Sequence, residues 1–121
     1  MLNETIKSGD WKGEKHVPVI KVKEAKAGEP VKVRVSIGDE IPHPNTFEHH
    51  IAWIKVFFKP EKGAAPVEVA STQLSAHGEL GVFTEPALKF KFTPEGNGTL
   101  YALSYCNIHG LWQSEEKIEL A

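Results

Sequence analysis

The residues best suited to chemistry lie near the end of the sequence, in the stretch Tyr105–Gly110. Cys106 is the only cysteine of the chain, and His109 follows it after two intervening residues. This spacing lets a thiolate and an imidazole reach one metal ion from a single turn of chain. Gly110 allows the backbone to turn sharply directly afterwards. The pair alone is a weak indication, because a lone cysteine more often serves as a small buried hydrophobic residue.

A second group of candidate ligands consists of four histidines at predicted loops or strand starts: His16, His43, His49 and His109. Loops held by a rigid β-scaffold commonly carry functional side chains. His43 stands between Pro42 and Pro44, whose fixed backbone angles lower the entropy cost of holding a ligand in place. Each histidine alone is best explained as an ordinary surface or hydrogen-bonded residue. Together with Cys106, the four favour a metal site.

Length and composition predict one globular domain over residues 1–121. Of the 121 residues, 40% are hydrophobic and 25% are charged, which is ordinary for a globular protein long enough to bury a core. The net charge of −2 does not indicate the basic stripe that binds nucleic acid, so no nucleic-acid partner is expected. The lysines are spread along alternating strands and are interpreted as solvated faces.

The sequence predicts neither secretion nor membrane insertion. Met1–Lys7 lacks the apolar core of a secretory signal, and no apolar run approaches the roughly 18 residues that cross a bilayer. A single cysteine excludes an intrachain disulfide, and a free thiol suits a reducing compartment. We therefore expect a cytoplasmic protein without a membrane partner.

Apolar and polar residues alternate over about seven short segments, which predicts strands. The clearest is 31–37, where Val and Ile alternate with Lys, Arg and Ser. The other predicted strands cover residues 17–23, 49–58, 67–74, 88–92, 99–105 and 117–120. Only an ambiguous turn at 3–12 is helical, so the predicted fold is all-β, an antiparallel sandwich. Four aromatic residues are expected in its core: Trp53, Phe57, Phe90 and Phe92.

Two loops and one strand bear on the candidate site. Ile41–Thr46 contains two prolines and is predicted to be a stiff loop. Thr93–Gly98 is the plainest hairpin turn of the sequence. Within 49–58, alternation puts His50 on the more uniformly apolar face and His49 on the other, so only one of them is expected to serve a given site.

Three segments, taken together in this order, resemble the superoxide reductase family: Glu14–Pro18, His43–His50 and Ser104–Trp112. The likeness is to the neelaredoxin type, which carries only the iron-binding domain of the desulfoferrodoxins, and it covers nearly the whole chain. Relatives with an added rubredoxin-like iron module would need a further cysteine cluster, which this chain lacks. The resemblance implies an immunoglobulin-like antiparallel β-sandwich.

The resemblance also implies a function, the one-electron reduction of superoxide to hydrogen peroxide without production of dioxygen. The cofactor would be one mononuclear non-haem iron (Fe2+/Fe3+), with four histidine nitrogens and an axial thiolate as ligands: His16, His43, His49, His109 and Cys106. Glu14 is implied as the sixth ligand of the oxidised iron, and Lys15 as the charge that attracts superoxide. The family further implies a rubredoxin-like electron donor and a homotetramer.

The chemistry of these donors agrees with that function. Four neutral imidazoles and one thiolate leave ferrous iron with a net charge of about +1 and one open position, which suits a small anion. The thiolate pushes electron density onto the iron. Backbone donors around Asn107 and Ile108 are expected to tune the sulfur.

Some features depart from the family pattern or have a structural explanation. Phe47 stands where a polar residue is expected, and the stretch Gly78–Val82 looks short, although neither departure removes a ligand. His77, in a glycine turn, is expected to make structural hydrogen bonds. Trp112 is expected either to cover the thiolate side of the iron or simply to pack.

The main alternative is a cupredoxin-like electron-transfer protein, which is also a β-sandwich with a C-terminal cysteine–histidine loop. Blue-copper sites use two histidines, one cysteine and usually an axial methionine, whereas the only methionine here is Met1. A zinc site takes four ligands and fits poorly with five convergent donors. A purely structural sandwich leaves the histidine loops unexplained.

Overall fold

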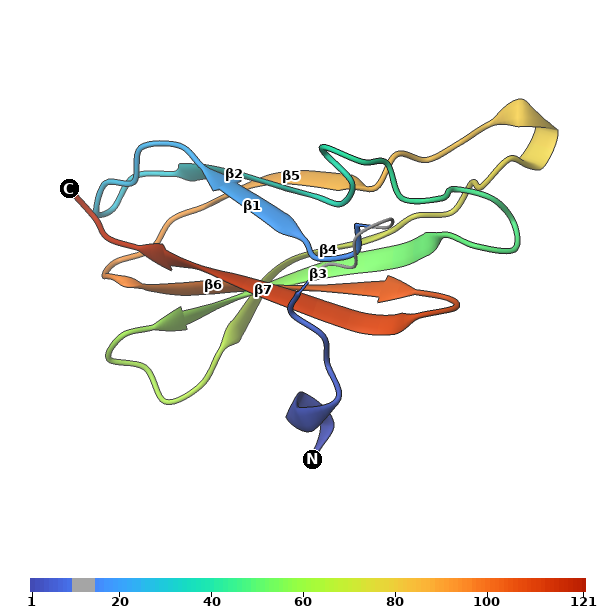
Figure 1. Cartoon of the computed structure of the whole chain (residues 1–121). Helices are drawn as coiled ribbons and strands as arrows, with labels where there is room; N and C mark the ends of the chain where they lie inside the picture. Colours follow the sequence, from blue (N-terminus) through green and yellow to red (C-terminus); the bar gives the residue numbers. More distant parts are fainter. Residues whose placement is uncertain (10–14) are drawn as a thin grey trace.

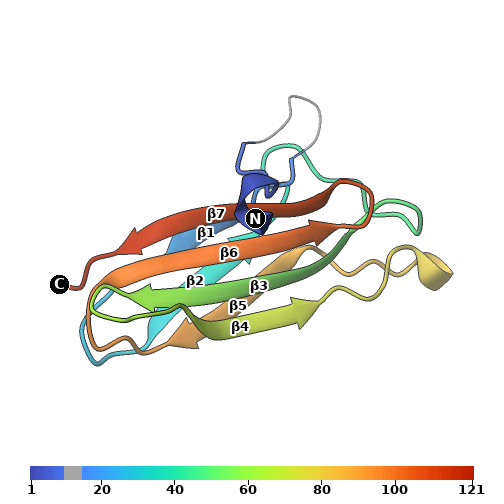
Figure 2. The ribbon, with the colours of Figure 1, turned by 90° about the horizontal axis from the view of Figure 1, so that it is seen from below.

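The computed structural model describes residues 1–9 and 15–121, and in them two antiparallel β-sheets pack face to face (Figure 1). One sheet has the strand order β1-β2-β5, with β1 at Val19–Val22, β2 at Val31–Ser36 and β5 at Ala87–Phe92. The other has the order β4-β3-β6-β7, with the bounds Ile51–Pro60 for β3, Val67–Gln73 for β4, Gly98–Cys106 for β6 and Gly110–Ile118 for β7. Figure 2 shows this sheet in front of the three-stranded one. The predicted all-β antiparallel sandwich is confirmed.

Two short 3-10 turns, η1 (Leu2–Glu4) and η2 (Glu79–Gly81), are the only helical elements in the described part of the chain. No helix among these residues is long and apolar enough to cross a membrane.

Strict alternation builds the core between the sheets. In β2, Val31, Val33 and Val35 are buried while Lys32 is exposed, because successive side chains of a strand point to opposite faces. Each fully buried valine or leucine contributes about 1.5–3 kcal/mol relative to an exposed one. The inward series of β6 ends on Cys106, which is fully buried, so the last core position of this strand is also a candidate ligand.

A β-bulge in β3 changes which residues face the core. Ile51 pairs with Cys106 and Trp53 pairs with Tyr105, so Ala52 is the extra residue. Ile51 and Ile54 are both buried, and the alternation predicted for His50, Ala52 and Ile54 as one face is therefore wrong at the start of the strand.

The same strand corrects part of the predicted aromatic core. Phe90 and Phe92 pack against the buried residues as expected. Trp53 and Phe57 are only half-buried, on the outer side of the four-stranded sheet, where Trp53 stacks on Tyr105 with 5.7 Å between the ring centroids. The expectation that these two residues lie in the core is wrong.

The segment 93–97 is not a hairpin turn, contrary to the prediction. It follows β5 in one sheet and leads into β6 in the other, so it crosses between the sheets. The tight hairpin is instead formed by residues 107–109, which join β6 to β7. The last strand accordingly begins at Gly110, well before the predicted Lys117.

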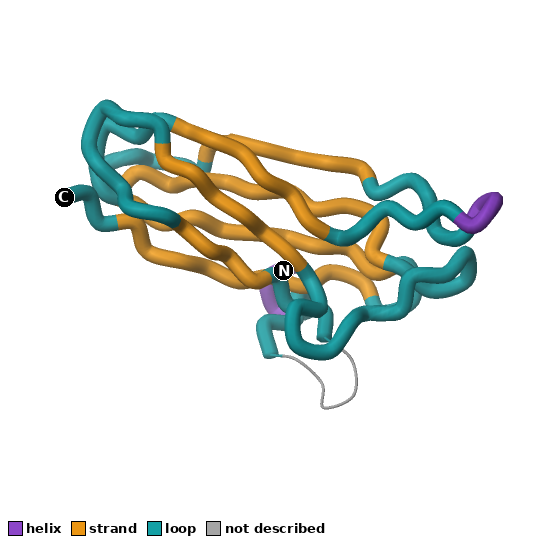
Figure 3. Tube along the Cα trace, turned by 90° about the horizontal axis from the view of Figure 1, so that it is seen from above, coloured by secondary structure: helices purple, strands orange, loops and turns teal. Residues whose placement is uncertain are grey.

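Three loops gather at one end of the sandwich, and two of them carry candidate ligands. Residues 37–50 follow β2, residues 74–86 connect β4 to β5, and residues 107–109 connect β6 to β7. All three lie at the right-hand end of Figures 1 and 2, opposite the C-terminus, and Figure 3 shows the same crowding of irregular chain beyond the strands.

Candidate metal centre

Four of the predicted ligands converge at the loop end of the sandwich. The ligand atoms of His16, His49, Cys106 and His109 all lie within 4.8 Å of one another. His16 Nε2 and His109 Nδ1 are 3.1 Å apart, and Cys106 Sγ lies 3.8 Å from His109 Nδ1. Two nitrogens bound side by side to one ion, with bonds of about 2.1 Å, are about 3 Å apart. The spacing therefore suits donors to a common ion.

His43 brings a fourth imidazole to this group. Its ring centroid lies 4.5 Å from that of His16 and 4.7 Å from that of His49. Its Nδ1 lies 2.7 Å from the carbonyl oxygen of Pro44, which can only accept, so Nδ1 carries the hydrogen and Nε2 holds the lone pair. Backbone acceptors of this kind fix the orientation of metal-binding histidines. The buried ring is thus held with Nε2 as its available donor atom.

The β6–β7 hairpin supplies both Cys106 and His109. The His109 N–H donates to Cys106 Sγ over 3.4 Å, a contact that stabilises negative charge on the sulfur. The Asn107 N–H donates instead to the carbonyl oxygen of His50 at 3.2 Å. The backbone donor expected around Asn107 and Ile108 is thus the N–H of His109, the residue after Ile108.

The segment that carries His16 is fixed by two hydroxyl groups from the opposite sheet. Ser104 Oγ donates to the carbonyl oxygen of His16 at 3.0 Å, and Ser114 Oγ donates to that of Pro18 at 2.6 Å. The ring of His16 stacks on the fully buried Trp112, with centroids 4.3 Å apart and planes 14° apart. Trp112 therefore orients a candidate ligand by packing on its imidazole.

A tight turn holds His49 and separates it from His50. The His49 N–H donates to Thr46 Oγ1 at 3.0 Å, and the Thr46 N–H donates to the carbonyl oxygen of His49 at 2.9 Å. The ring of His49 lies 5.0 Å from that of His109, whereas His50 stacks on His77 at 3.6 Å. His49 is thus the member of the pair that joins the cluster, as the resemblance implies, and His50 does not lie on the core face.

His77 lies in the neighbouring loop, where its contacts agree with the structural role expected from the sequence. Its Nε2 donates to the carbonyl oxygen of Leu74 at 2.6 Å, and its Nδ1 lies 2.7 Å from Asn45 Oδ1. Asn45 Nδ2 in turn donates to the carbonyl oxygen of Thr84 at 3.0 Å. Sequence reasoning missed Asn45, which ties the β4–β5 loop to the loop that carries His43.

Of the two predicted catalytic residues, the structure describes one. Lys15 is half-buried and lines a hollow of about 310 Å³ together with Val17, Lys21 and Asp39. Glu14, predicted as the sixth ligand, lies outside the described residues.

The donor set suits a transition metal. Imidazole and thiolate are ligands that iron, copper and zinc accept, whereas calcium and magnesium require oxygen. The buried Cys106 sulfur and one ring nitrogen from each of three histidines, His16, His49 and His109, lie within 4.8 Å of one another, and His43 lies against two of these rings. Fold and side chains together define a β-sandwich with a histidine–cysteine candidate metal centre at its loop end.

Comparison with known proteins places the chain in one family. The family model described as Desulfoferrodoxin matches residues 8–115, and the chain belongs to that family.

The relatives agree over almost the whole length. A protein of Thermococcus kodakarensis named superoxide reductase is 59% identical, over 98% of this chain and 100% of that protein. The neelaredoxin of Megalodesulfovibrio gigas is 43% identical, over 97% of this chain and 96% of that protein. The crystal structure of a putative superoxide reductase from Thermotoga maritima superimposes with a TM-score of 0.92 at 49% identity, covering 100% of this chain and 98% of the other.

Proposed function

We propose that this chain is a superoxide reductase with one mononuclear non-haem iron, held by four histidines and one cysteine: His16, His43, His49, His109 and Cys106. The observation that carries the proposal is the convergence of three imidazoles and the Cys106 thiol within 4.8 Å at the loop end. The names of the relatives support it, since the proteins 56–59% identical to this chain are called superoxide reductase.

Iron bound there would supply one-electron chemistry, by which superoxide gains one electron and two protons and becomes hydrogen peroxide, without release of dioxygen. The chain's own residues set the conditions for that step. Cys106 donates electron density as a thiolate, and the His109 N–H at 3.4 Å from the sulfur limits how much it donates. Trp112, stacked on His16 at 4.3 Å, excludes water from that side of the centre.

Lys15 and Glu14 are proposed to act at the position where superoxide binds. Lys15 places a positive charge next to His16 in the chain, and that charge attracts the superoxide anion. Glu14, one residue earlier, is proposed as the carboxylate that ligates the oxidised iron when no substrate is bound.

The cupredoxin-like alternative is weaker. Its axial methionine would have to be Met1, which is 92% exposed at the start of the chain. A copper carrier also leaves more imidazoles in the cluster than its site uses.

Three further properties are proposed with the enzyme. The electron donor is a rubredoxin-like protein, and the chain acts as a single domain in the cytoplasm. The protein is a homotetramer, which is supported by exposed apolar side chains at the loop end that would otherwise face water: Phe47, Leu80, Val82, Phe83 and Ile108.

Metal analysis and a superoxide assay test the proposal together. We expect about one iron per chain, a nearly colourless reduced form, a blue oxidised form, and one peroxide formed per superoxide consumed. Stoichiometric copper with an intense blue band would favour the electron carrier. Zinc, or the absence of any metal, would refute the enzyme.

A further inference from the structure

The outer face of the three-stranded sheet carries a grid of basic side chains. The strand register aligns three rows across β1, β2 and β5, and the row nearest the loop end is neutral: Val19, Ser36 and Ala87. The two following rows are entirely cationic: Lys21, Arg34 and Lys89, then Lys23, Lys32 and Lys91. These six side chains, which we call the basic face, line one hollow of about 490 Å³.

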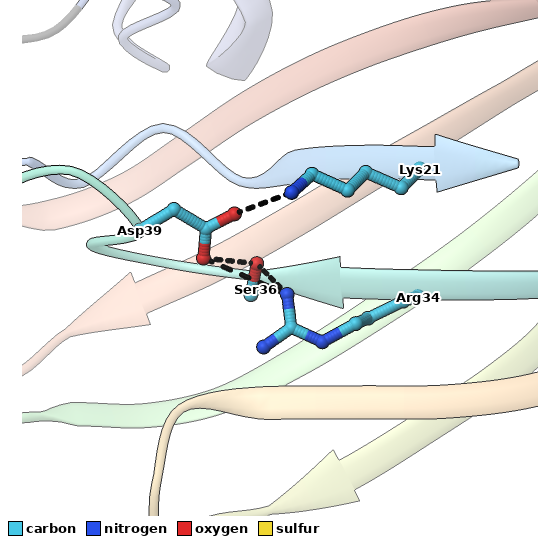
Figure 4. Close-up of polar contacts among 4 residues, drawn as sticks. All are labelled: Lys21, Arg34, Ser36 and Asp39. Carbon is cyan, nitrogen blue, oxygen red and sulfur yellow. Dashed lines mark hydrogen bonds and ion pairs between the residues drawn. The ribbon is translucent and has the colours of Figure 1, made fainter.

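One carboxylate balances part of this charge. Asp39 reaches back from the loop after β2, with Oδ2 3.5 Å from Lys21 Nζ and Oδ1 3.6 Å from an Arg34 nitrogen (Figure 4). Among the described residues, no carboxylate lies within ion-pair distance of the other four: Lys23, Lys32, Lys89 and Lys91. Six positive charges therefore stand against one negative charge, in a chain whose net charge is −2.

This arrangement costs the fold stability. Lys32 lies directly opposite Lys91 and is joined through its backbone to Lys23, so like charges meet on both sides of the central strand. Like charges placed opposite each other on neighbouring strands destabilise a sheet. A carboxylate at position 32 would reverse both repulsions, so packing and pairing do not explain the lysine.

The proposed chemistry requires a partner that the chain does not contain. Each superoxide reduced removes one electron from the centre, and that electron must be restored from outside. A chain with one cysteine has no second thiolate-held iron centre to supply it. The donor is therefore a separate molecule, which is oxidised by one electron when it reduces the centre.

We propose that the basic face is the docking surface for a small acidic electron-transfer protein that re-reduces the metal centre; this inference rests on the proposed function. Charge complementarity identifies the partner as an acidic protein surface. Redox partners form small, transient complexes whose encounter depends on complementary charge. A compact face with six cations is suited to such an encounter with an acidic protein.

The basic face adjoins the candidate metal centre. Lys21 lines both the basic hollow and the second hollow, in which Lys15 lies. Lys15 directly precedes His16, and the neutral row begins at Val19, three residues after that histidine. A protein seated on the basic face thus contacts β1, the strand that directly follows the segment carrying His16.

A charge-reversal variant distinguishes an effect on docking from an effect on folding stability. Lys32→Glu replaces two repulsive cross-strand pairs by two attractive ones, so its melting temperature should rise while the docking of an acidic donor weakens. Lys117→Glu is the matched control, because this lysine is exposed on β7 of the other sheet and the change of charge is the same.

The kinetic test uses oxidised holoprotein and reduced rubredoxin, a small acidic iron protein. At low ionic strength, Lys32→Glu should lower the second-order rate constant of reduction about five-fold, Lys117→Glu should leave it unchanged, and high salt should remove the difference. Equal rate constants for the two variants at low salt would overturn the proposal.

A binding measurement locates the contact without relying on turnover. On adding zinc-substituted rubredoxin, we expect amide NMR shifts on β1, β2 and β5, whereas shifts confined to the 107–109 hairpin and residues 43–50 would contradict the basic face as the docking site. The reaction of the reduced holoprotein with superoxide, followed separately, tests the proposed function. If rubredoxin bound at the basic face but the reduced holoprotein did not react with superoxide, the proposed enzymatic function would be refuted and the docking surface would stand.

Discussion

His50 and Asn107 form two hydrogen bonds with each other across a sequence separation of 57 residues. The His50 N–H donates to Asn107 Oδ1 at 2.9 Å, and the Asn107 N–H donates to the carbonyl oxygen of His50 at 3.2 Å. Asn107 Nδ2 also donates to the carbonyl oxygen of Glu48 at 3.0 Å. One side chain thus holds the residues on both sides of His49 against the hairpin that carries the other ligands.

We expect Asn107→Ala to loosen this connection. The substitution removes two side-chain hydrogen bonds, so the free energy of unfolding should fall by about 1–2 kcal/mol, and the affinity for iron should fall as well. Chemical denaturation and competition with a chelator measure the two effects. Asn97→Ala, which removes a bond to the Leu120 N–H, is the control. Equal losses of iron affinity in both variants would contradict a local role for Asn107.

Cys106→Ser tests the thiolate directly. The visible band of the oxidised protein is expected to disappear, since a serine oxygen does not give the low-energy sulfur-to-metal charge transfer. Absorption spectra of variant protein with its iron content determined would show this. If the band survived, Cys106 could not be the sulfur ligand.

Lys15→Ala should slow the capture of superoxide without releasing iron. Removing a cation beside the centre weakens the attraction of an anion, and the loss should be largest at low ionic strength. Rapid-mixing or pulse-radiolysis rate constants over a range of salt concentrations measure it. Lys62→Ala, on an exposed loop, is the control. Superimposable salt profiles for wild type and Lys15→Ala would argue against steering.

Asp39 makes part of the stability depend on pH. The hydrogen bond from Ser36 Oγ at 2.6 Å lowers the pKa of Asp39, with the charges of Arg34 and Lys21 adding to the effect, and these outweigh desolvation. A pKa depressed on folding contributes stability that is present above the ordinary value of 3.8 and is lost as the pH falls through the folded value.

Asp39→Asn should therefore be less stable than wild type at pH 7, and the difference should shrink as the pH falls below about 4. Denaturation curves at a series of pH values measure it. Glu40→Gln, which removes a neighbouring charge with no ion pair among the described residues, should not reproduce this pattern. A pH-independent deficit in Asp39→Asn would contradict the linkage.

Gly38 is required by both its backbone angle and its surroundings. Its φ is +82°, and an added Cβ would lie 2.7 Å from the backbone nitrogen of His43. Gly38→Ala should lower the free energy of unfolding by about 2–3 kcal/mol and weaken iron binding, since the His43 backbone must move.

Gly28→Ala separates the cost of the positive backbone angle from the cost of the steric contact with His43. Gly28 has a similar φ of +73° but no heavy atom within 4 Å of the added Cβ. Its loss should be about 1 kcal/mol, with iron binding intact. Thermal melts with and without iron distinguish the variants. If Gly38→Ala cost no more than Gly28→Ala, the contact with His43 would be unimportant.

Local patterns predicted the strands well, because alternation depends on residues two positions apart. The valines of β2 are an example, and the predicted number of about seven strands is confirmed. Which strands pair is not local. Thr93–Gly98 has every feature of a hairpin turn, yet it joins two sheets. The sequence alone suggests that the lysines are scattered, because only the strand order β1-β2-β5 shows that many of them share one face of a sheet.

The candidate site divides in the same way. His16, His49, Cys106 and His109 were identified by residue type and spacing, and the structure brings their ligand atoms together. The residues that position them were not predicted, because Asn45, Asn107 and Ser104 act through side-chain contacts whose partners lie far along the chain. The bulge at Ala52 was missed because one inserted residue leaves no local signature.

His16 and His109 are 93 residues apart along the chain, so an ion bound to both would have a second effect. An ion held by both would join two distant parts of the chain, a junction that only the folded sandwich allows. An ion that binds only the folded form also stabilises it by mass action. Chelation would then loosen the whole sandwich, so resistance to heat would depend on the supply of metal as well as on the core.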